Sequence, residues 1–221
     1  MSAIIALTAQ NTTGVTAIHE LPPEFVTAQL DAVFDDIGVD AAKTGMLFSA
    51  ALIEAVADFL EQHRVPLVVD PVMVASSGAK LLEDDAVATL VARLFPLATV
   101  VTPNRDEATA LVGAGSPDEQ AKRLVEFGAA AAIVTGGGAG DAFFDGETAL
   151  DIPVRRREGG ATHGSGCTHS ATLAALLARG EDLISAAVVA AATASDAVGH
   201  GLAELGSGEG PVDVFHLKGG R

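Results

Sequence analysis

Short, wholly apolar runs recur along the chain and alternate with segments in which apolar residues follow helical spacing. Leu67-Val68-Val69 is one such run, and residues 131–134 are another. Strands that are apolar on both faces are typical of a parallel sheet with helices on both sides, and alternating strands and helices are typical of α/β proteins. The strand candidates are residues 2–8, 41–46, 66–70, 99–102 and 131–135; the helix candidates are residues 23–37, 50–60 (with Ser49 as cap), 84–94, 104–111, 117–127, 166–179 and 181–198; a polar hairpin covers about 141–154. The sequence therefore predicts a single α/β domain over residues 1–221, with a mainly parallel central sheet.

Polar residues and glycines stand where several of these strands end. Gln10 follows the first strand candidate, Asp70 ends the third, Asn104 follows the fourth, and Gly136-Gly137-Gly138 follows the fifth. In open α/β sheets, ligands bind beyond the carboxyl ends of the strands. We therefore expect these residues to lie along one edge of the sheet and to contribute to a binding site.

The segment Thr162-His163-Gly164-Ser165-Gly166-Cys167-Thr168 stands directly before a predicted helix. Its glycines let several N–H groups point at one spot, and the helix N-terminus adds partial positive charge. Such a turn suits a transferring phosphoryl group. At this place the pKa of the Cys167 thiol is expected to be lowered. The alternative is a glycine-rich turn with a buried cysteine that acts as a small hydrophobic residue.

Three further polar positions have a functional and a structural explanation each. Asn104 and Glu107 stand three residues apart at a predicted helix start, where they could hold Mg²⁺ through water or form a capping box. Asp70 is either a carboxylate of a metal or phosphate site or a turn aspartate. The Gln10 amide can donate and accept toward a heterocycle edge, or it is a polar residue at a strand end. Met46 is more typical of a core than of a ligand site.

The formal net charge of −16 argues against nucleic acid and anionic membranes as partners, because both bind basic surfaces. Cys167 is the single cysteine, so no internal disulfide exists, and a reducing, cytoplasmic location is expected. No charge-free apolar run is long enough to span a membrane. His200 stands between two glycines and is expected to be satisfied by the backbone. No cluster of His and Cys along the sequence indicates a zinc site.

Several motifs occur in an order that resembles the hydroxymethylpyrimidine phosphate kinases of thiamine biosynthesis, which belong to the ribokinase-like superfamily. They are Thr8-Ala9-Gln10-Asn11-Thr12, Lys43-Thr44-Gly45-Met46-Leu47, Val69-Asp70-Pro71-Val72-Met73, the segment from Thr102 to Glu107, the segment from Thr162 to Thr168, and Val198-Gly199-His200-Gly201. The resemblance runs over essentially the whole chain. Relatives in the wider superfamily usually carry Asp where Cys167 stands, whereas one class of pyridoxal kinases shares the Cys.

The resemblance implies ATP-dependent phosphorylation of hydroxymethylpyrimidine on its hydroxyl, followed by phosphorylation of the monophosphate to the diphosphate. It implies that Gln10 reads the aminopyrimidine edge, that Met46 and Val72 pack on the ring, and that Cys167 is the base for the attacking hydroxyl. It further implies anion-hole N–H groups at Gly164, Ser165 and Gly166, a nucleotide site with Asp70, Asn104, Thr135 and Gly137, and Mg²⁺ near Asn104 and Glu107. The expected partner is a small-molecule substrate, and a homodimer is a further expectation.

Two departures from the family pattern leave alternatives open. Family members carry an additional N-terminal strand, glycine-rich substrate loop and helix, so the resemblance predicts that this chain lacks the family's first strand and helix, through a misassigned start codon or as a fragment. Thr135 stands where many relatives have Lys before two glycines. Pyridoxal kinase, or a pyrimidine-binding descendant without catalysis, are the alternative functions.

Overall fold

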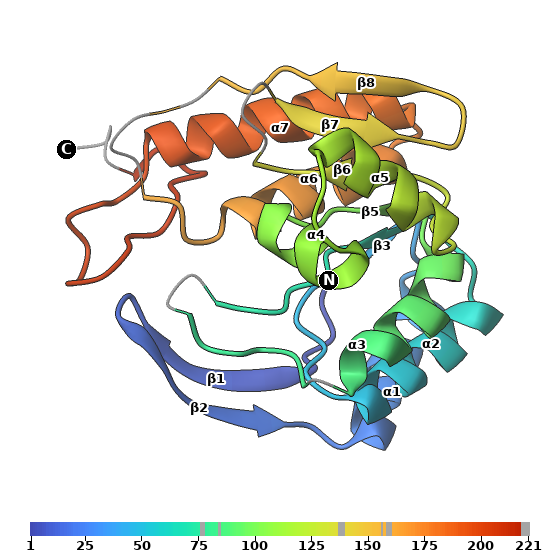
Figure 1. Cartoon of the computed structure of the whole chain (residues 1–221). Helices are drawn as coiled ribbons and strands as arrows, with labels where there is room; N and C mark the ends of the chain where they lie inside the picture. Colours follow the sequence, from blue (N-terminus) through green and yellow to red (C-terminus); the bar gives the residue numbers. More distant parts are fainter. Residues whose placement is uncertain (76–77, 84, 137–139, 156, 158–160, 218–221) are drawn as a thin grey trace.

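A six-stranded sheet with the order β3-β4-β5-β6-β7-β8 organises the computed structural model, which describes residues 1–75, 78–83, 85–136, 140–155, 157 and 161–217 (Figure 1). The strands are β3 (Ala42–Thr44), β4 (Leu67–Val69), β5 (Val100–Val101), β6 (Ala132–Val134), β7 (Asp141–Phe144) and β8 (Ala149–Ile152). The first four of these strands pair in parallel, and β7 and β8 add antiparallel pairs. The predicted mainly parallel sheet and the hairpin expected at about residues 141–154 are confirmed.

The helices follow the predicted pattern closely. They are α1 (Pro23–Asp36), α2 (Ala50–Gln62), α3 (Ala86–Thr89), α4 (Arg105–Val112), α5 (Pro117–Glu126), α6 (Ser165–Ala178) and α7 (Leu183–Gly199). Ser49 caps α2 as predicted, because its hydroxyl accepts the Leu52 N–H. The expected helix at residues 84–94 differs, since α3 continues into a π-helical turn over Leu90–Leu94 and a 3₁₀ turn over Phe95–Leu97. Within the described residues, no helix combines the length and the apolar character needed to cross a bilayer.

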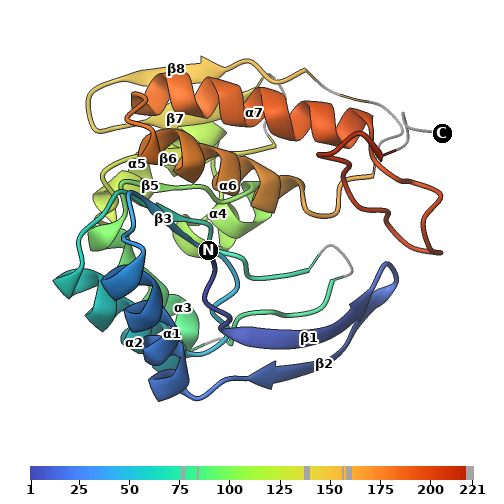
Figure 2. The ribbon, with the colours of Figure 1, turned by 180° about the vertical axis from the view of Figure 1, so that it is seen from behind.

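Helices cover both faces of the sheet because successive strand residues point to opposite sides. Val69, Val101 and Val134 face the core shared with α2 and α5, whereas Val68 and Val100 face a second core shared with α6 and α7. Figure 1 shows α4 and α5 in front of the sheet, and the reverse view in Figure 2 shows α6 and α7 in front of it. The continuous apolar strands thus have the two-sided burial that their composition predicted.

The first strand candidate belongs to a separate hairpin and does not join the six-stranded sheet. β1 (Ala6–Asn11) pairs antiparallel with β2 (Gly14–Glu20) in a two-stranded sheet that lies apart from the main sheet (Figure 1). The Asn11 side chain accepts the N–H groups of Thr13 and Gly14 at 2.9 and 3.1 Å, which closes a tight turn after β1. The prediction that Gln10 stands at a carboxyl end of the main sheet is therefore wrong.

The tip of this hairpin touches the loop that follows α7. The Gly208 N–H donates to Thr12 Oγ1 at 3.3 Å, and a Cβ atom at Gly208 would lie 1.9 Å from the Thr12 carbonyl oxygen. A larger residue at position 208 would therefore displace either the loop or the hairpin. This contact joins two segments that lie far apart in the sequence.

Candidate active site

Backbone hydrogen bonds continue the strand pairing past the carboxyl ends of the parallel strands. The Asp70 N–H donates to the Thr44 carbonyl at 3.1 Å, and the Thr135 N–H donates to the Pro103 carbonyl at 2.9 Å. Asn104 and Thr135 form a parallel bridge beyond β5 and β6. The predicted placement of Asp70 and Asn104 along one edge of the sheet is therefore confirmed, and Thr135 lies beside Asn104.

Asp70 lies in a buried network with two residues from other elements. The hydroxyl of Ser170, on α6, donates to Asp70 Oδ2 at 2.9 Å, and Lys43 Nζ, on β3, donates to Ser170 Oγ at 3.0 Å. Lys43 Nζ also lies 3.5 Å from Asp70 Oδ2. Burial raises the pKa of Asp70, while the Lys43 charge and the Ser170 hydrogen bond oppose the increase. Asp70 thus connects β3, β4 and α6 at the edge where the site was expected.

Asn104 and Glu107 form the capping box that the sequence allowed. Asn104 Oδ1 accepts the N–H groups of Asp106 and Glu107, and Glu107 Oε2 accepts the Asn104 N–H, all at 2.9 Å. The Met73 N–H approaches Glu107 Oε1 at 3.4 Å. Burial raises the pKa of Glu107 to about 7, with a further increase from the Asp70 charge, although the two backbone donors oppose it. Besides capping α4, Glu107 therefore places a buried carboxylate next to Asp70. Carboxylate oxygens are hard donors of the kind that Mg²⁺ prefers.

The glycine-rich turn before α6 has a left-handed glycine directly before the helix and no side-chain cap. This glycine is Gly164, with φ +88°. The Ser165 N–H donates to the Thr162 carbonyl at 3.0 Å, so Ser165 is not the free donor that was expected. The following N–H groups, at Gly166 and Cys167, belong to the first turn, whose donors have no partner inside a helix. The prediction of an anion hole at this helix start therefore narrows to these two groups.

The C-terminal loop fixes the position of that turn. The His163 N–H donates to the Gly210 carbonyl at 3.3 Å, and the Val212 N–H donates to the His163 carbonyl at 3.0 Å. Gly210 must approach closely, because a Cβ atom there would lie 2.2 Å from the Leu202 carbonyl oxygen. The position of the turn before α6 therefore depends on residues that follow α7.

Cys167 lies in the first turn of α6, as predicted, but its thiol pKa is shifted in the opposite direction from the prediction. Although the residue is exposed, partial burial of the thiol raises its pKa. Lys43 lowers the pKa of the thiol, whereas Asp70 and Glu107 raise it. The prediction of a lowered thiol pKa at this position is wrong, because loss of hydration and two nearby carboxylates raise it. The same interactions place Cys167, Lys43, Asp70 and Glu107 in one electrostatic cluster.

The residues expected to bind the pyrimidine lie outside this network. Gln10 is exposed on β1, and its side-chain oxygen accepts the Thr8 hydroxyl at 3.3 Å. A bulge between Ala9 and Gln10 changes the register of the hairpin there, a feature often found next to functional sites. Met46 and Val72 are half-buried, and Met46 lines a groove of about 770 Å³ that also includes Lys43. Gly137 lies outside the described residues.

Lys43 and Ser170 both interact with Asp70, but the sequence alone gave neither residue a role. Ser170 stands 127 residues from Lys43 and 100 residues from Asp70, so no local spacing connects them. The available signal was chemical: Lys43 is a cation inside a strand candidate in a strongly acidic chain. Such a residue is buried at low cost only when an anion lies beside it.

The raised pKa of Glu107 predicts a stability that falls as the pH rises. The folded state keeps the proton up to about pH 7, whereas the unfolded carboxyl releases it near pH 4.5. The contribution is therefore complete below pH 4.5 and is lost as the pH rises through 7, by roughly 3 kcal/mol. Asp141, whose pKa burial raises to about 6, adds a loss of the same sign.

Urea unfolding between pH 5 and pH 8 measures this effect. Glu107→Gln should flatten the decline, and Asp141→Asn should remove a separate part of it. At pH 5 Glu107 is protonated in the folded wild-type protein, so comparison with Glu107→Gln there isolates the loss of capping-box geometry. A wild-type stability that rises steadily from pH 5 to pH 8 would contradict the buried, protonated Glu107.

The sequence profile of the family described as phosphomethylpyrimidine kinase matches residues 1–213. The hydroxymethylpyrimidine/phosphomethylpyrimidine kinase of Rhizobium meliloti is 47% identical, over 97% of this chain and 85% of that protein. The thiamine biosynthesis bifunctional protein ThiED of Geobacter sulfurreducens is also 47% identical, over 96% of this chain and 45% of that protein.

Solved structures show the same fold. The phosphomethylpyrimidine kinase of Clostridium difficile matches with a TM-score of 0.75 and 31% identity, over 86% of this chain and 83% of that chain. The pyridoxal kinase of Staphylococcus aureus in complex with pyridoxal matches with a TM-score of 0.86 and 30% identity, over 98% and 82% of the two chains. Sequence similarity thus favours the pyrimidine kinases, while the fold is shared by both groups. By its sequence profile and its relatives, this chain belongs to the phosphomethylpyrimidine kinase family.

Proposed function

We propose that this chain transfers a phosphoryl group from ATP to 4-amino-5-hydroxymethyl-2-methylpyrimidine and then to its monophosphate, which yields the diphosphate used in thiamine biosynthesis. The main support for the proposal is that the turn before α6 lies close to the acidic residues at the edge of the sheet. The Cys167 thiol interacts electrostatically with Asp70 and Glu107, which come from the ends of other elements. An anion hole beside carboxylates is the arrangement that phosphoryl transfer from a metal–nucleotide complex needs.

In this proposal the anion hole stabilises the phosphoryl group while it is transferred. The N–H groups of Gly166 and Cys167 point outward from the N-terminal end of α6, where the helix dipole favours negative charge. Phosphoryl transfer has a loose transition state with charge spread over the equatorial oxygens, so positioned donors contribute more than covalent chemistry does. Gly164 supplies the left-handed backbone that opens the turn, with φ +88°.

Cys167 accepts the proton of the attacking hydroxyl in this proposal. Because the pKa of its thiol is raised, Cys167 is protonated in most molecules at neutral pH. The thiolate is therefore a minor species that becomes more abundant as pH rises, and its carboxylate neighbours make it a stronger base. Lys43 limits the shift through its charge.

Asp70 and Glu107 would hold Mg²⁺ on the nucleotide side, with Asn104 and Thr135 beside them. The donor set fits the ion, since both carboxylates are buried hard-oxygen donors and they interact electrostatically. The bound ion supplies charge neutralisation for the phosphate groups. Glu107 must be ionised to serve, so the affinity for Mg²⁺ should increase as the pH rises toward about 7.

Substrate choice is tested by ADP release with three acceptors: hydroxymethylpyrimidine, its monophosphate and pyridoxal. Both pyrimidines should be phosphorylated, and pyridoxal should be the poorest acceptor. Gln10→Leu should raise the KM for the pyrimidine by about 10–100-fold, since it removes hydrogen bonds to the heterocycle. The variant should keep the wild-type melting temperature because Gln10 is exposed.

The other functions predict different outcomes in the same assay. Activity on pyridoxal alone would identify a pyridoxal kinase. A chain that binds the pyrimidine in calorimetry but releases no ADP with any acceptor would be a binding protein. A Gln10→Leu variant with an unchanged KM would remove Gln10 from the substrate site.

A further inference from the structure

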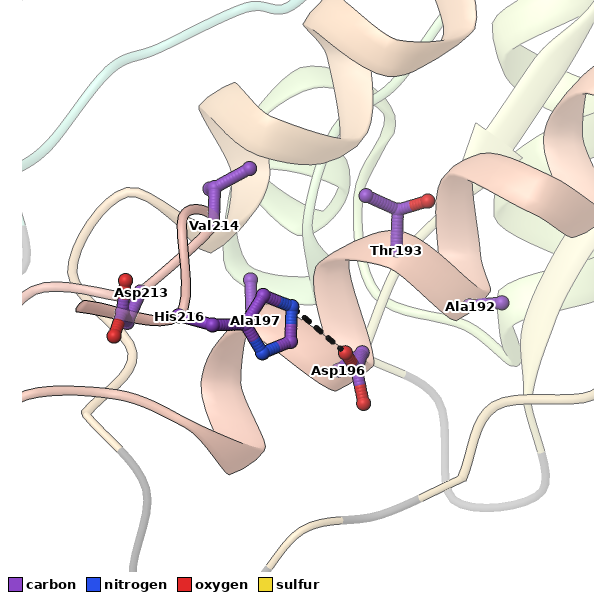
Figure 3. A pocket seen from close by; sticks show the side chains of 7 residues that line it. All are labelled: Ala192, Thr193, Asp196, Ala197, Asp213, Val214 and His216. Carbon is purple, nitrogen blue, oxygen red and sulfur yellow. Dashed lines mark ion pairs between the residues drawn. The ribbon is translucent and has the colours of Figure 1, made fainter. Parts of the chain in front are cut away.

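Two histidines and one aspartate converge at the C-terminal end of α7. None of them belongs to the cluster around Asp70. Asp196 and His200 stand four residues apart, at the last turn and the cap of the helix. His216 comes from the segment after the loop and returns to the same place (Figure 3). One ligand atom from each of the three residues lies within 4.8 Å of the others.

The separations between these ligand atoms suit a shared cation better than direct hydrogen bonds. Asp196 Oδ2 lies 3.5 Å from His200 Nδ1 and 3.6 Å from His216 Nε2. Hydrogen bonds between nitrogen and oxygen are usually about 2.7–3.2 Å long. A tetrahedral ion with bonds of about 2.0–2.1 Å separates its ligand atoms by about 3.4 Å. Asp196 Oδ2 therefore lies from both histidine nitrogens at about the distance expected between two ligands of one metal ion.

Neighbouring groups fix the orientation of these ligands. Arg157 donates to the other carboxylate oxygen, Asp196 Oδ1, at 3.0 Å, which orients the carboxylate and leaves Oδ2 toward the histidines. The two imidazole rings lie 4.2 Å apart between centroids. His200 Nδ1 also lies 3.0 Å from the Asp196 carbonyl oxygen, so ligation through Nδ1 requires that nitrogen to release its proton.

Two of the three ligands, Asp196 and His216, border a pocket that leaves room for further donors. A depression of about 290 Å³ is lined by Asp196 and His216 together with Thr193 and the buried Asp213. Figure 3 shows the His216 ring directed at Asp196 from the facing segment. Sites with three protein ligands and an open position are typical of zinc bound with water or a small molecule.

We propose that Asp196, His200 and His216 form a transition-metal site that fits Zn²⁺, separate from the proposed Mg²⁺ position at Asp70 and Glu107. The imidazole nitrogens select zinc, cobalt, nickel or copper over magnesium, which prefers oxygen donors. A bound ion would join α7 to residues 213–216. Val212, directly before this segment, donates its N–H to the His163 carbonyl in the turn before α6. A bound metal ion would therefore stabilise the segment that holds the turn before α6 in place.

Co²⁺ titration of the metal-free, full-length chain tests the proposal. We expect one Co²⁺ per chain with visible d–d absorption, displacement by equimolar Zn²⁺, persistence in millimolar Mg²⁺, and a higher melting temperature with Zn²⁺. His200→Ala, His216→Ala and Asp196→Asn should each weaken Co²⁺ binding by about 100-fold or more, since loss of even an outer-shell partner costs about 10–100-fold. Binding should release protons, seen as a buffer-dependent heat in calorimetry.

Two matched variants separate this site from other sources of binding. His19→Ala changes an exposed histidine on β2 and should leave Co²⁺ affinity unchanged. Cys167→Ser should also leave it unchanged. Binding that disappears in Cys167→Ser, or that survives in the His200→Ala/His216→Ala double variant, would overturn the proposal. Absence of Co²⁺ or Zn²⁺ binding at millimolar concentration would overturn it as well. Pyrimidine phosphorylation measured on the same samples reports separately on the proposed kinase function.

Discussion

Cys167→Ala is expected to reduce turnover on hydroxymethylpyrimidine by about 10²–10⁴-fold, the usual contribution of a positioned general base. The variant removes the group that accepts the hydroxyl proton but leaves the backbone N–H groups of the α6 turn in place. The loss should therefore appear in kcat, with little change in the KM for the pyrimidine. Steady-state ADP release at saturating ATP measures both constants.

The pH profile distinguishes a base from a residue that only fills space. Burial raises the pKa of the Cys167 thiol above its ordinary 9.0, so the wild-type rate should still increase at pH 9. Cys167→Ala should lose this basic limb. Cys167→Asp places a carboxylate at the same position and should restore part of the rate with a profile that is flat above neutrality.

A matched change on the same helix controls for indirect effects. Ala175→Ser alters an exposed position on α6 and should keep wild-type turnover and melting temperature. If Cys167→Ala retains near-wild-type kcat, Cys167 is not the base, and the anion hole alone accounts for the chemistry.

Lys43→Met is expected to destabilise the fold by about 3–5 kcal/mol at pH 8, because it leaves the Asp70 carboxylate buried without its cation. The Asp70 side chain is 7% exposed, and Lys43 Nζ is 3.5 Å from it. The remaining Ser170 hydrogen bond cannot replace a charge, and Glu107 adds repulsion. Urea unfolding followed by circular dichroism gives the free energy of unfolding.

The destabilisation caused by Lys43→Met should depend on pH. Burial already raises the pKa of Asp70, and loss of Lys43 raises it further. Protonation in the folded state then relieves the unpaired charge, so the destabilisation should be smaller at pH 5 than at pH 8. Removing the carboxylate as well, in Lys43→Met/Asp70→Asn, should recover much of the loss at pH 8.

Lys122→Met is the matched control, since Lys122 is exposed on α5 with its Nζ 5.9 Å from the Phe144 ring centroid. That change should cost less than about 1 kcal/mol. Equal costs for Lys43→Met and Lys122→Met, or a Lys43→Met cost that does not vary with pH, would exclude the buried ion pair as a source of stability.

Local patterns predicted most of the architecture. The runs around Val68, Val100 and Ile133 are apolar on both faces, and each became a central strand with helices on both sides. The capping box at Asn104 and the cap at Ser49 were also predictable, because both depend on residues within one helical turn.

The errors arose where distant parts of the chain decide the outcome. Residues 6–11 have strand character, but their pairing with β2 follows from the Asn11 turn and not from apolarity. The helix start at Cys167 favours a thiolate locally, yet burial of the thiol, together with Asp70 and Glu107 from other elements, raises its pKa. Ser170 and Lys43 are linked across 127 residues, and His216 meets Asp196 only after the loop has returned. Sequence spacing carries no information about such encounters.

The contact between the hairpin tip and the loop after α7 has a consequence for the order of events in the cell. Thr12 and Gly208 are 196 residues apart, and no earlier segment can make their hydrogen bond. At about 5–20 residues per second, a ribosome needs roughly 10–40 s between adding the first and the second of these residues. During that time the hairpin has left the exit tunnel without its final neighbour. Until the last loop has been synthesised, the hairpin tip therefore lacks the neighbour that the folded protein gives it.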